Sequence, residues 1–153
     1  MSESLVTIRA ARPEDIGAMA GLLEELAVVD EDFRTETSAR LRGLSMMLEN
    51  HGGRVILVAD ERGRIVGMCS AQLFVSLAEG GPVAMVENLV VARSGRGVGI
   101  GSSLLKAAEA WAAASGAKGL QIVVDAGNIP SLEFLMKNGW RRTERLRVSR
   151  TIA

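Results

Sequence analysis

Three apolar segments of strand length follow one another in the middle of the chain, and only short polar turns separate them. They cover residues 54–59, 65–75 and 83–91. Turns this short join antiparallel neighbours, because a parallel connection needs a crossover of a dozen or more residues. A helix pattern and one more apolar strand, 120–124, come afterwards, which predicts one right-handed parallel crossover. The sheet is therefore expected to be mixed rather than doubly wound.

The two ends of the chain add further elements to this sheet. Apolar spacing, turn residues and helix-start signals predict a strand at 5–10, helices starting near Pro13, at 38–49 and at 128–138, and a last strand at 145–152. The last strand is inferred from alternating polar and apolar residues. A length of 153 residues suits one domain, 1–153.

Composition excludes several classes of partner. Acidic and basic residues balance at 18 each, so net charge gives no reason to expect nucleic acid or an anionic membrane. No apolar run is long enough for a membrane-spanning helix. Cys69 and His51 are the only residues of their types, so neither a disulfide nor a metal site is expected, and Cys69 suits the core. The N-terminus lacks a signal-peptide pattern, which favours a cytoplasmic protein.

Four alternate glycines, at positions 95, 97, 99 and 101, separate the strand 83–91 from the next helix. Glycine lets a ligand approach the main chain, and the first amides of a helix are unpaired and partly positive. The loop is thus a site for an anion such as phosphate, unless the helix start merely needs a flexible backbone. A dinucleotide fingerprint fits poorly, because its third position falls on Ser102, and no Lys-Ser or Lys-Thr follows as in triphosphate loops.

Two motifs resemble those of the GNAT superfamily of N-acetyltransferases. The spacing Arg96-x-x-Gly99-x-Gly101 resembles the family's acyl-CoA pyrophosphate loop. Residues 128–140 resemble its C-terminal motif, Asn-x-x-Ala-x-x-Phe-Tyr-x-Lys-x-Gly-Phe. The match is close over about residues 84–142, and the N-terminal half agrees only in element order. The resemblance implies an α/β (α+β) fold with a mostly antiparallel sheet, one parallel strand pair splayed for acyl-CoA, and helices on both faces.

The resemblance also implies where acetyl-CoA binds. Main-chain groups of Leu89, Val90 and Val91 would pair with the pantetheine arm like an added strand. The pyrophosphate would lie on the amides of Arg96, Gly97, Val98, Gly99, Ile100 and Gly101. The second motif adds Asn128, Ser131, Phe134 and Lys137. Each of these four also has a simpler explanation. Asn128 could be a helix cap and Ser131 a small residue that allows close approach of the cofactor. Phe134 could be a core side chain and Lys137 a solvated lysine.

Catalysis on an amine requires removal of a proton, because a lysine-like amine has a pKa of about 10.4 and is almost fully charged at pH 7. By the resemblance, Glu87 is the general base, acting directly or through water. The alternatives are a solvent-facing acid of its strand and a bulge residue without a role in proton transfer. The family's frequent tyrosine acid corresponds to Leu135, and the chain has no tyrosine. Water or the hydroxyl of Ser131 then has to protonate the leaving thiol.

The acceptor is expected to be a small-molecule or protein primary amine. In the family the segment that here contains Asp30 and Glu31 borders the acceptor, and Trp140 shapes the same side; a solvated loop is the alternative for the acids. The apolar last strand offers an edge for a homodimer. Because the tyrosine is missing, a non-catalytic acyl-CoA sensor is the main alternative function. A nucleotide-binding domain is the weaker one.

Overall fold

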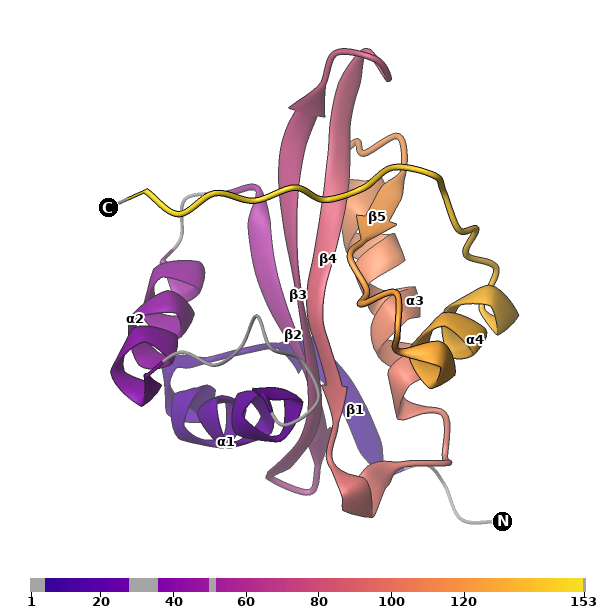
Figure 1. Cartoon of the computed structure of the whole chain (residues 1–153). Helices are drawn as coiled ribbons and strands as arrows, with labels where there is room; N and C mark the ends of the chain where they lie inside the picture. The colour runs from indigo at the N-terminus through magenta and orange to yellow at the C-terminus, as the bar shows by residue number, and fades with distance from the viewer. Residues whose placement is uncertain (1–4, 28–35, 50–51, 153) are drawn as a thin grey trace. The chain divides into compact units, whose positions relative to one another are not determined.

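The computed structural model describes residues 5–27, 36–49 and 52–152. Its chain forms two units, Met1–Ile122 and Val123–Ala153. Figure 1 shows the course of the chain and the labels of its elements.

The first unit contains a five-stranded sheet with the order β1-β2-β3-β4-β5. The strands are β1 Val6–Ala10, β2 Arg54–Glu61, β3 Arg64–Ser76, β4 Gly81–Val91 and β5 Leu120–Ile122. Neighbouring strands are antiparallel except β4 and β5, which are parallel (Figure 1). The mixed sheet with one parallel pair is therefore confirmed, although β5 ends two residues earlier than predicted.

The turn between β2 and β3 is tighter than the four residues expected from the sequence. Only Arg62 and Gly63 lie outside the strands, with φ of 52° and 87°. Two successive positive φ values are typical of a type I′ hairpin turn, whose twist matches the flanking strands. The amide of Gly63 donates to Asp60 Oδ1 at 2.6 Å, so the carboxylate of the strand end fixes the turn.

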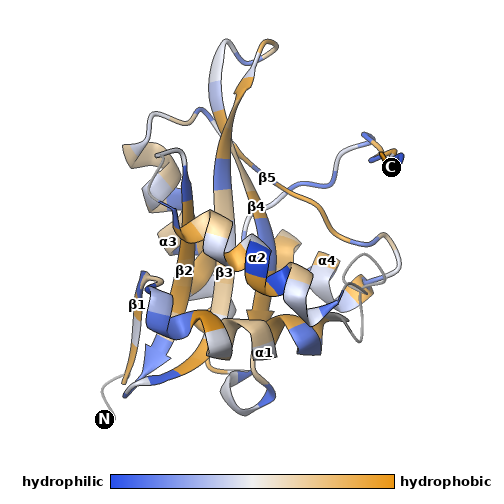
Figure 2. Cartoon of the chain, turned by 90° about the vertical axis from the view of Figure 1, so that its left-hand side faces the viewer, coloured by the Kyte–Doolittle hydropathy of each residue, from blue (hydrophilic) through white to orange (hydrophobic). Residues whose placement is uncertain are grey.

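Helices cover both faces of the sheet, as expected. A 3-10 turn, Pro13–Asp15, leads into α1 Ile16–Ala27, and α2 Thr37–Leu48 lies beside it on the same face (Figure 2). The opposite face carries α3 Ile100–Ala114 (Figure 1). Residues alternate between the two faces along a strand, so Met68 packs under α1 while the next residue, Cys69, lies 3.8 Å from the Leu104 carbonyl of α3.

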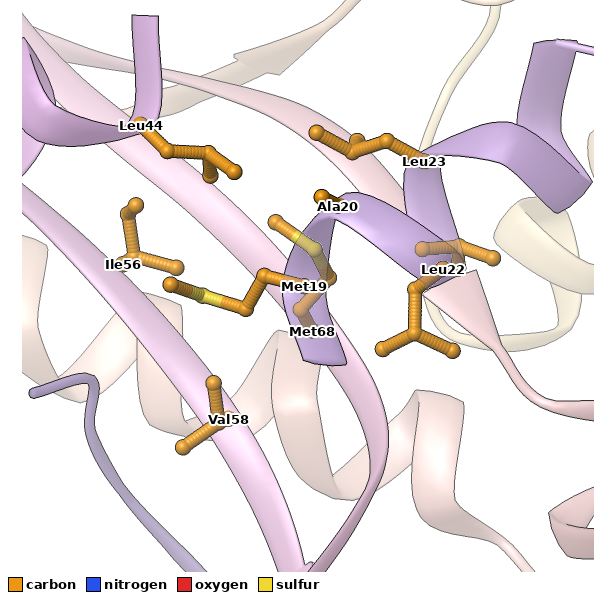
Figure 3. Packing of buried hydrophobic residues seen from close by; sticks show 9 residues of the cluster. Met19, Ala20, Leu22, Leu23, Leu44, Ile56, Val58 and Met68 are labelled. Carbon is orange, nitrogen blue, oxygen red and sulfur yellow. The ribbon is translucent and has the colours of Figure 1, made fainter. Parts of the chain in front are cut away.

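The core beneath α1 and α2 is aliphatic. Met19 of α1 and Val58 and Met68 of the sheet are almost inaccessible to solvent (Figure 3). The cluster also includes Ala20, Leu22, Leu23, Leu44, Ile56 and Val90. Full burial of such a side chain stabilises the fold by about 1.5–3 kcal/mol, so this packing fixes α1 and α2 on the sheet.

A charged network fastens the start of α1 to the edge of the sheet. The guanidinium of Arg9 donates to both carboxylate oxygens of Asp15, at 2.8 and 3.0 Å, and to Asp60 at 3.1 Å. Asp15 also accepts the Arg12 amide at 2.7 Å, which closes the 3-10 turn. The side-chain hydrogen bond from Arg9 is the largest cause that holds the pKa of Asp15 below its usual range.

The substitution Asp15→Asn is expected to lower the free energy of unfolding by about 2 kcal/mol at pH 7, because charge-assisted hydrogen bonds from Arg9 are lost. The folded-state pKa of Asp15 is depressed, so its contribution is present above the unfolded pKa of about 3.9 and disappears as pH falls below it. Denaturant titrations at pH 7 and pH 3 should therefore show the difference shrinking at pH 3. The exposed neighbour Glu14→Gln is the control, and an equal loss there would contradict the account.

The second unit contains one helix, α4 Ile129–Lys137, and an extended tail. The predicted strand at 145–152 is wrong, since residues 141–152 form no helix or strand. Alternating polar and apolar residues suit a strand that has one buried face. A strand also needs a neighbouring strand to pair with its backbone hydrogen-bonding groups. Leu146 and Val148 accordingly remain 88% and 89% exposed.

Candidate functional site

The N-terminus of α3 presents amides without helical partners. Gly99 is the N-cap in a left-handed conformation, φ 84°, and no side chain caps the helix. The Ser103 amide donates to the Gly99 carbonyl, so the amides of Ile100, Gly101 and Ser102 come before the first helical hydrogen bond. The first turn contains no acidic residue, which leaves the positive end of the helix dipole available to an anion.

Two glycines shape the loop before this helix. Gly97 and Gly99 have φ of 85° and 84°, a region that most side chains avoid, and no atom lies within 4 Å of an added Cβ at either position. The backbone conformation therefore favours glycine, and no atom occupies the space that a Cβ would take. Val98 between them is 73% exposed.

Ile100 anchors the loop from below. Its side chain is buried, and an added Cβ at Gly95 would approach Ile100 Cδ1 to 3.0 Å. The Ile100 side chain therefore belongs to the core, and only its amide is free to contribute to the predicted anion site. Gly95 is therefore needed for close packing against Ile100. The alternating glycine pattern gave no sign of this role.

Arg96 ties the loop to the end of β4. Its Nε donates to the Val91 carbonyl at 3.1 Å. On the same side, Arg64 of β3 donates to Ser94 Oγ at 3.1 Å. Arg96 thus has a structural role in addition to the positive charge that it brings to the predicted phosphate site.

The predicted splay between β4 and β5 is present. Pairing of the two strands stops at Val86 opposite Ile122, and β4 continues to Val91. Leu89, Val90 and Val91 lie in this continuation, where β4 pairs with β3 only, as far as the described residues show. Backbone groups on the β5 side of the stretch need other partners, which an extended ligand with amides can provide.

A bulge interrupts β4 next to Glu87. The register shifts between Met68 and Ser70, and Asn88 has φ 58°, which is uncommon outside glycine and tolerated by asparagine. The Ser70 hydroxyl lies 2.8 Å from Asn88 Oδ1 and 3.2 Å from the Glu87 carbonyl oxygen, so it can donate to either. Sequence reasoning did not single out Ser70 or Asn88, and an Asn inside an apolar strand was the available signal.

Glu87 is exposed on β4 directly opposite Ser70 in the antiparallel register. Side chains of directly opposed residues point to the same face of a sheet. Glu87 therefore lies on the face that α1 and α2 cover, close to the polar group formed by Ser70 and Asn88.

A cavity of 340 Å³ opens on this face of the sheet, between α1, α2 and strands β2 to β4. Its apolar lining includes Leu23, Leu44, Met47, Ile56 and Met68. Among the described residues, its polar lining includes Arg40, Ser70, Gln72 and Asn88. Arg40 of α2 has a side chain only 11% exposed, and its Nη2 lies 3.7 Å from Glu24 Oε1. Arg40 was not identified from the sequence, because a basic residue in a polar helix gives no signal of its own.

The residues predicted from the second motif lie on α4 and around it. Asn128 is the N-cap, and its Oδ1 accepts the Ser131 amide at 3.3 Å, so its capping role is confirmed. Phe134 is half-buried, Lys137 is exposed and Trp140 is half-buried. Leu135, in the place of the family's tyrosine, is buried. Contacts of Asn128, Ser131, Phe134, Lys137 and Trp140 with ligands stay predictions.

Three residues named from the sequence, Asp30, Glu31 and His51, lie outside the described residues. Where the structure describes the chain, no three His, Cys, Asp or Glu side chains gather as metal ligands. None of its described helices is long and apolar enough to cross a membrane.

Cys69 is a core residue, as expected. It is fully buried, and burial raises the pKa of its thiol to about 12. Because the thiolate is the reactive form, a thiol reagent such as DTNB should detect no thiol in the native protein and one equivalent per chain after unfolding. Rapid reaction of the native protein would contradict the burial of Cys69. An unreactive Cys69 would also add no background signal to an assay that measures thiol release from acetyl-CoA.

Known proteins of similar sequence and structure include several acetyltransferases. Residues 20–140 match the sequence model of the acetyltransferase (GNAT) family. The chain is 30% identical over 139 residues to the uncharacterized N-acetyltransferase YhfO of Bacillus subtilis (strain 168), covering 88% of this chain and 89% of that protein. It is 29% identical over 149 residues to the aminoglycoside N(6')-acetyltransferase type 1 of Stenotrophomonas maltophilia, covering 95% and 93%. The solved structure of aminoglycoside N-acetyltransferase AAC(6')-Iy in complex with CoA has a TM-score of 0.83 at 20% identity, covering 97% and 95%.

Proposed function

The chain belongs to the acetyltransferase (GNAT) family and is an N-acetyltransferase, and we propose that it transfers the acetyl group of acetyl-CoA to a primary amine by direct attack, with Glu87 as general base. The observation that carries the proposal is the uncapped N-terminus of α3, which lies where the open edge of β4 ends.

The residues present fit acetyl-CoA. The amides of Ile100, Gly101 and Ser102 suit a pyrophosphate, and Arg96 adds positive charge. The main-chain groups of Leu89 to Val91 suit the amides of a pantetheine arm. When bound, acetyl-CoA supplies an acetyl group activated as a thioester.

The exposure of Glu87 on the face of β4 that α1 and α2 cover supports its proposed role as general base. A lysine-like amine is neutral in about one molecule per thousand or fewer at pH 7, a deficit of about 4–5 kcal/mol. In this proposal Glu87 accepts the proton that the ammonium group has to lose, directly or through one water.

Departure of the CoA thiol does not require a tyrosine as proton donor. A thiol with a pKa near 8.5 leaves as the thiolate at a cost of only about 2 kcal/mol at pH 7. Water or the Ser131 hydroxyl then provides the proton. A positioned acid contributes about 10²–10⁴-fold, so its replacement by the buried Leu135 predicts a slower enzyme rather than an inactive one.

The remaining ligand contacts proposed are those carried over from the family motif. Asn128, Ser131, Phe134 and Lys137 contact the cofactor, while Asp30, Glu31 and Trp140 border the acceptor. Acidic residues at that border would favour a cationic amine. The relative from Stenotrophomonas maltophilia is named for an aminoglycoside, which makes an aminoglycoside amine one candidate acceptor.

Release of CoA thiol from acetyl-CoA, measured over a broad panel of amines, tests this function. Thiol release that depends on the acceptor supports transfer. CoA binding without acceptor-dependent thiol across the panel would contradict it and favour an acyl-CoA sensor, the alternative that the buried Leu135 suggests. Tighter binding of ATP or NAD than of CoA would contradict both.

A homodimer is also part of the proposal. It is supported by the exposed apolar side chains of the tail, Leu146, Val148 and Ile152. Light scattering on a size-exclusion column gives the mass directly, and a monomer at all concentrations would contradict the dimer.

A further inference from the structure

The bulge in β4 decides on which face of the sheet Glu87 lies. In the antiparallel register Ser70 lies opposite Glu87, and Met68 lies opposite Val90. One residue of β3 between these pairs therefore faces two residues of β4. In a regular strand, residues three positions apart belong to opposite faces, because side chains alternate. The extra residue of the bulge brings Glu87 and Val90 to the same face.

The packing of α1 and α2 on the sheet fixes this face for Val90. The Val90 side chain belongs to the core cluster beneath these two helices and is 6% exposed. If β4 were regular from Glu87 to Val90, a buried Val90 would place Glu87 on the opposite face, which α3 covers. The proposed base therefore shares the face of the cavity because of the bulge.

The backbone of the bulge is in a conformation that favours glycine. Asn88 is the first of the two bulged residues, and its φ is 58°. Bulges of this kind usually have glycine at this place. Asparagine tolerates the left-handed region better than most residues, but less well than glycine. The bulge at Asn88 therefore needs support from neighbouring groups.

Ser70 gives this support from the neighbouring strand. Its hydroxyl lies 2.8 Å from Asn88 Oδ1 and 3.2 Å from the Glu87 carbonyl oxygen. Both oxygens belong to the bulged segment, and the single hydroxyl proton can be donated to either of them. Ser70 is 5% exposed, and its neighbours Cys69 and Ala71 are buried apolar residues. A hydroxyl in such a place is costly unless it is hydrogen-bonded, so its contacts with β4 are what stabilises it there.

Building on the proposed acetyl transfer with Glu87 as base, we infer that Ser70 is a positioning residue. Its hydroxyl holds the bulge at Asn88 and thereby keeps Glu87 on the face that α1 and α2 cover. Ser70 takes no part in proton transfer. Loss of the hydroxyl reduces the fraction of molecules in which Glu87 is in place, which lowers kcat. A lost contact with the acceptor would instead raise KM.

Thiol release from acetyl-CoA tests the role of Ser70, with kanamycin A or the amine of the panel that reacts fastest as acceptor. Ser70→Ala is expected to lower kcat about 10-fold, the upper value for one hydrogen bond, and to leave KM within about twofold. Ser70→Thr keeps the hydroxyl and should restore kcat to within about threefold of the parent protein. Ser76→Ala is the matched control, because Ser76 is on the same strand and its Oγ accepts the Glu79 amide at 3.2 Å. It should change neither constant, and melting curves should show that all variants fold.

Two double-mutant cycles separate positioning from a general effect on the fold. Glycine at position 88 adopts the bulge without support, so Ser70→Ala should change kcat by less than about threefold in the Asn88→Gly protein. The same small change is expected in the Glu87→Gln protein, where the base is already absent. An equal loss of about 10-fold in all three backgrounds, or a rise in KM alone, would overturn the inference while the proposed function stands. If Glu87→Gln changes no rate, the proposed base and the inference both fail, although acetyl transfer stands.

If no acceptor releases thiol, the proposed function fails, and NMR decides separately whether Ser70 holds the bulge. A strong nuclear Overhauser effect between the amide and α protons of one residue is typical of a positive φ. Loss of this signal at Asn88 in Ser70→Ala, with its retention in Ser70→Thr, supports the inference. Retention of the signal in Ser70→Ala would overturn it.

Discussion

The substitution Gly99→Asp is expected to weaken CoA binding at least about 30-fold relative to Gly99→Asn, and the two variants should lose a similar amount of stability because a side chain strains the left-handed backbone at this position. Asn and Asp both tolerate the left-handed conformation that Gly99 adopts, and an added Cβ there meets no atom within 4 Å. The two variants therefore share shape and strain, and only Asp adds a negative charge beside the proposed pyrophosphate site. Two unit charges about 4 Å apart interact by about 4 kcal/mol near a protein surface. Screening reduces this to about 2 kcal/mol, which is about 30-fold in Kd.

Isothermal titration with CoA measures the Kd of each Gly99 variant. Added salt should reduce the difference in Kd between Gly99→Asp and Gly99→Asn. Gly80→Asp is the matched control. Gly80 also has a positive φ, 73°, with open space around it, and it lies in the turn between β3 and β4. Equal CoA affinity of Gly99→Asp and Gly99→Asn would place the phosphates elsewhere.

The second large effect is expected from Glu87→Gln, which should reduce kcat/KM about 10²–10⁴-fold at pH 7. The loss should shrink as pH approaches the pKa of the acceptor amine, because the neutral amine then forms without a base. A pH–rate profile from pH 6 to pH 10 measures this dependence. CoA affinity should not change, since the proposed role of Glu87 is at the acceptor amine and not at the phosphate loop.

Glu79→Gln is the control for Glu87, as an exposed acid of the neighbouring turn with no role in the site. Unchanged kinetics of Glu87→Gln at every pH would remove Glu87 from the mechanism. A uniform loss across the pH range would leave Glu87 as a binding residue only.

The sheet could be predicted because its strands are long apolar runs bounded by turn residues. The strands from 54 to 91 and the parallel return at 120 follow from local patterns that the tertiary structure reinforces. The irregular backbone of the glycine loop could be predicted for the same reason, since the left-handed φ of Gly97 and Gly99 is a local requirement that glycine meets most easily.

Features that depend on contacts between distant segments could not be predicted. The bulge at Asn88 is fixed by Ser70 of the neighbouring strand, and the cavity around Arg40 exists only once α2 is packed on β2 and β3. The error at 145–152 has the same origin. The alternating pattern describes one face of a strand and carries no information on whether a partner strand is present.

Acetyl-CoA labelled with carbon-13 in its acetyl group tests the central claim most directly. After incubation with the protein and the amine panel, mass spectrometry and NMR should find the label on an amine nitrogen of one acceptor class, and Gly99→Asp should abolish most of that product. A protein that binds CoA at α3 but leaves the label in acetyl-CoA with every amine would contradict acetyl transfer and identify the site as one for binding alone.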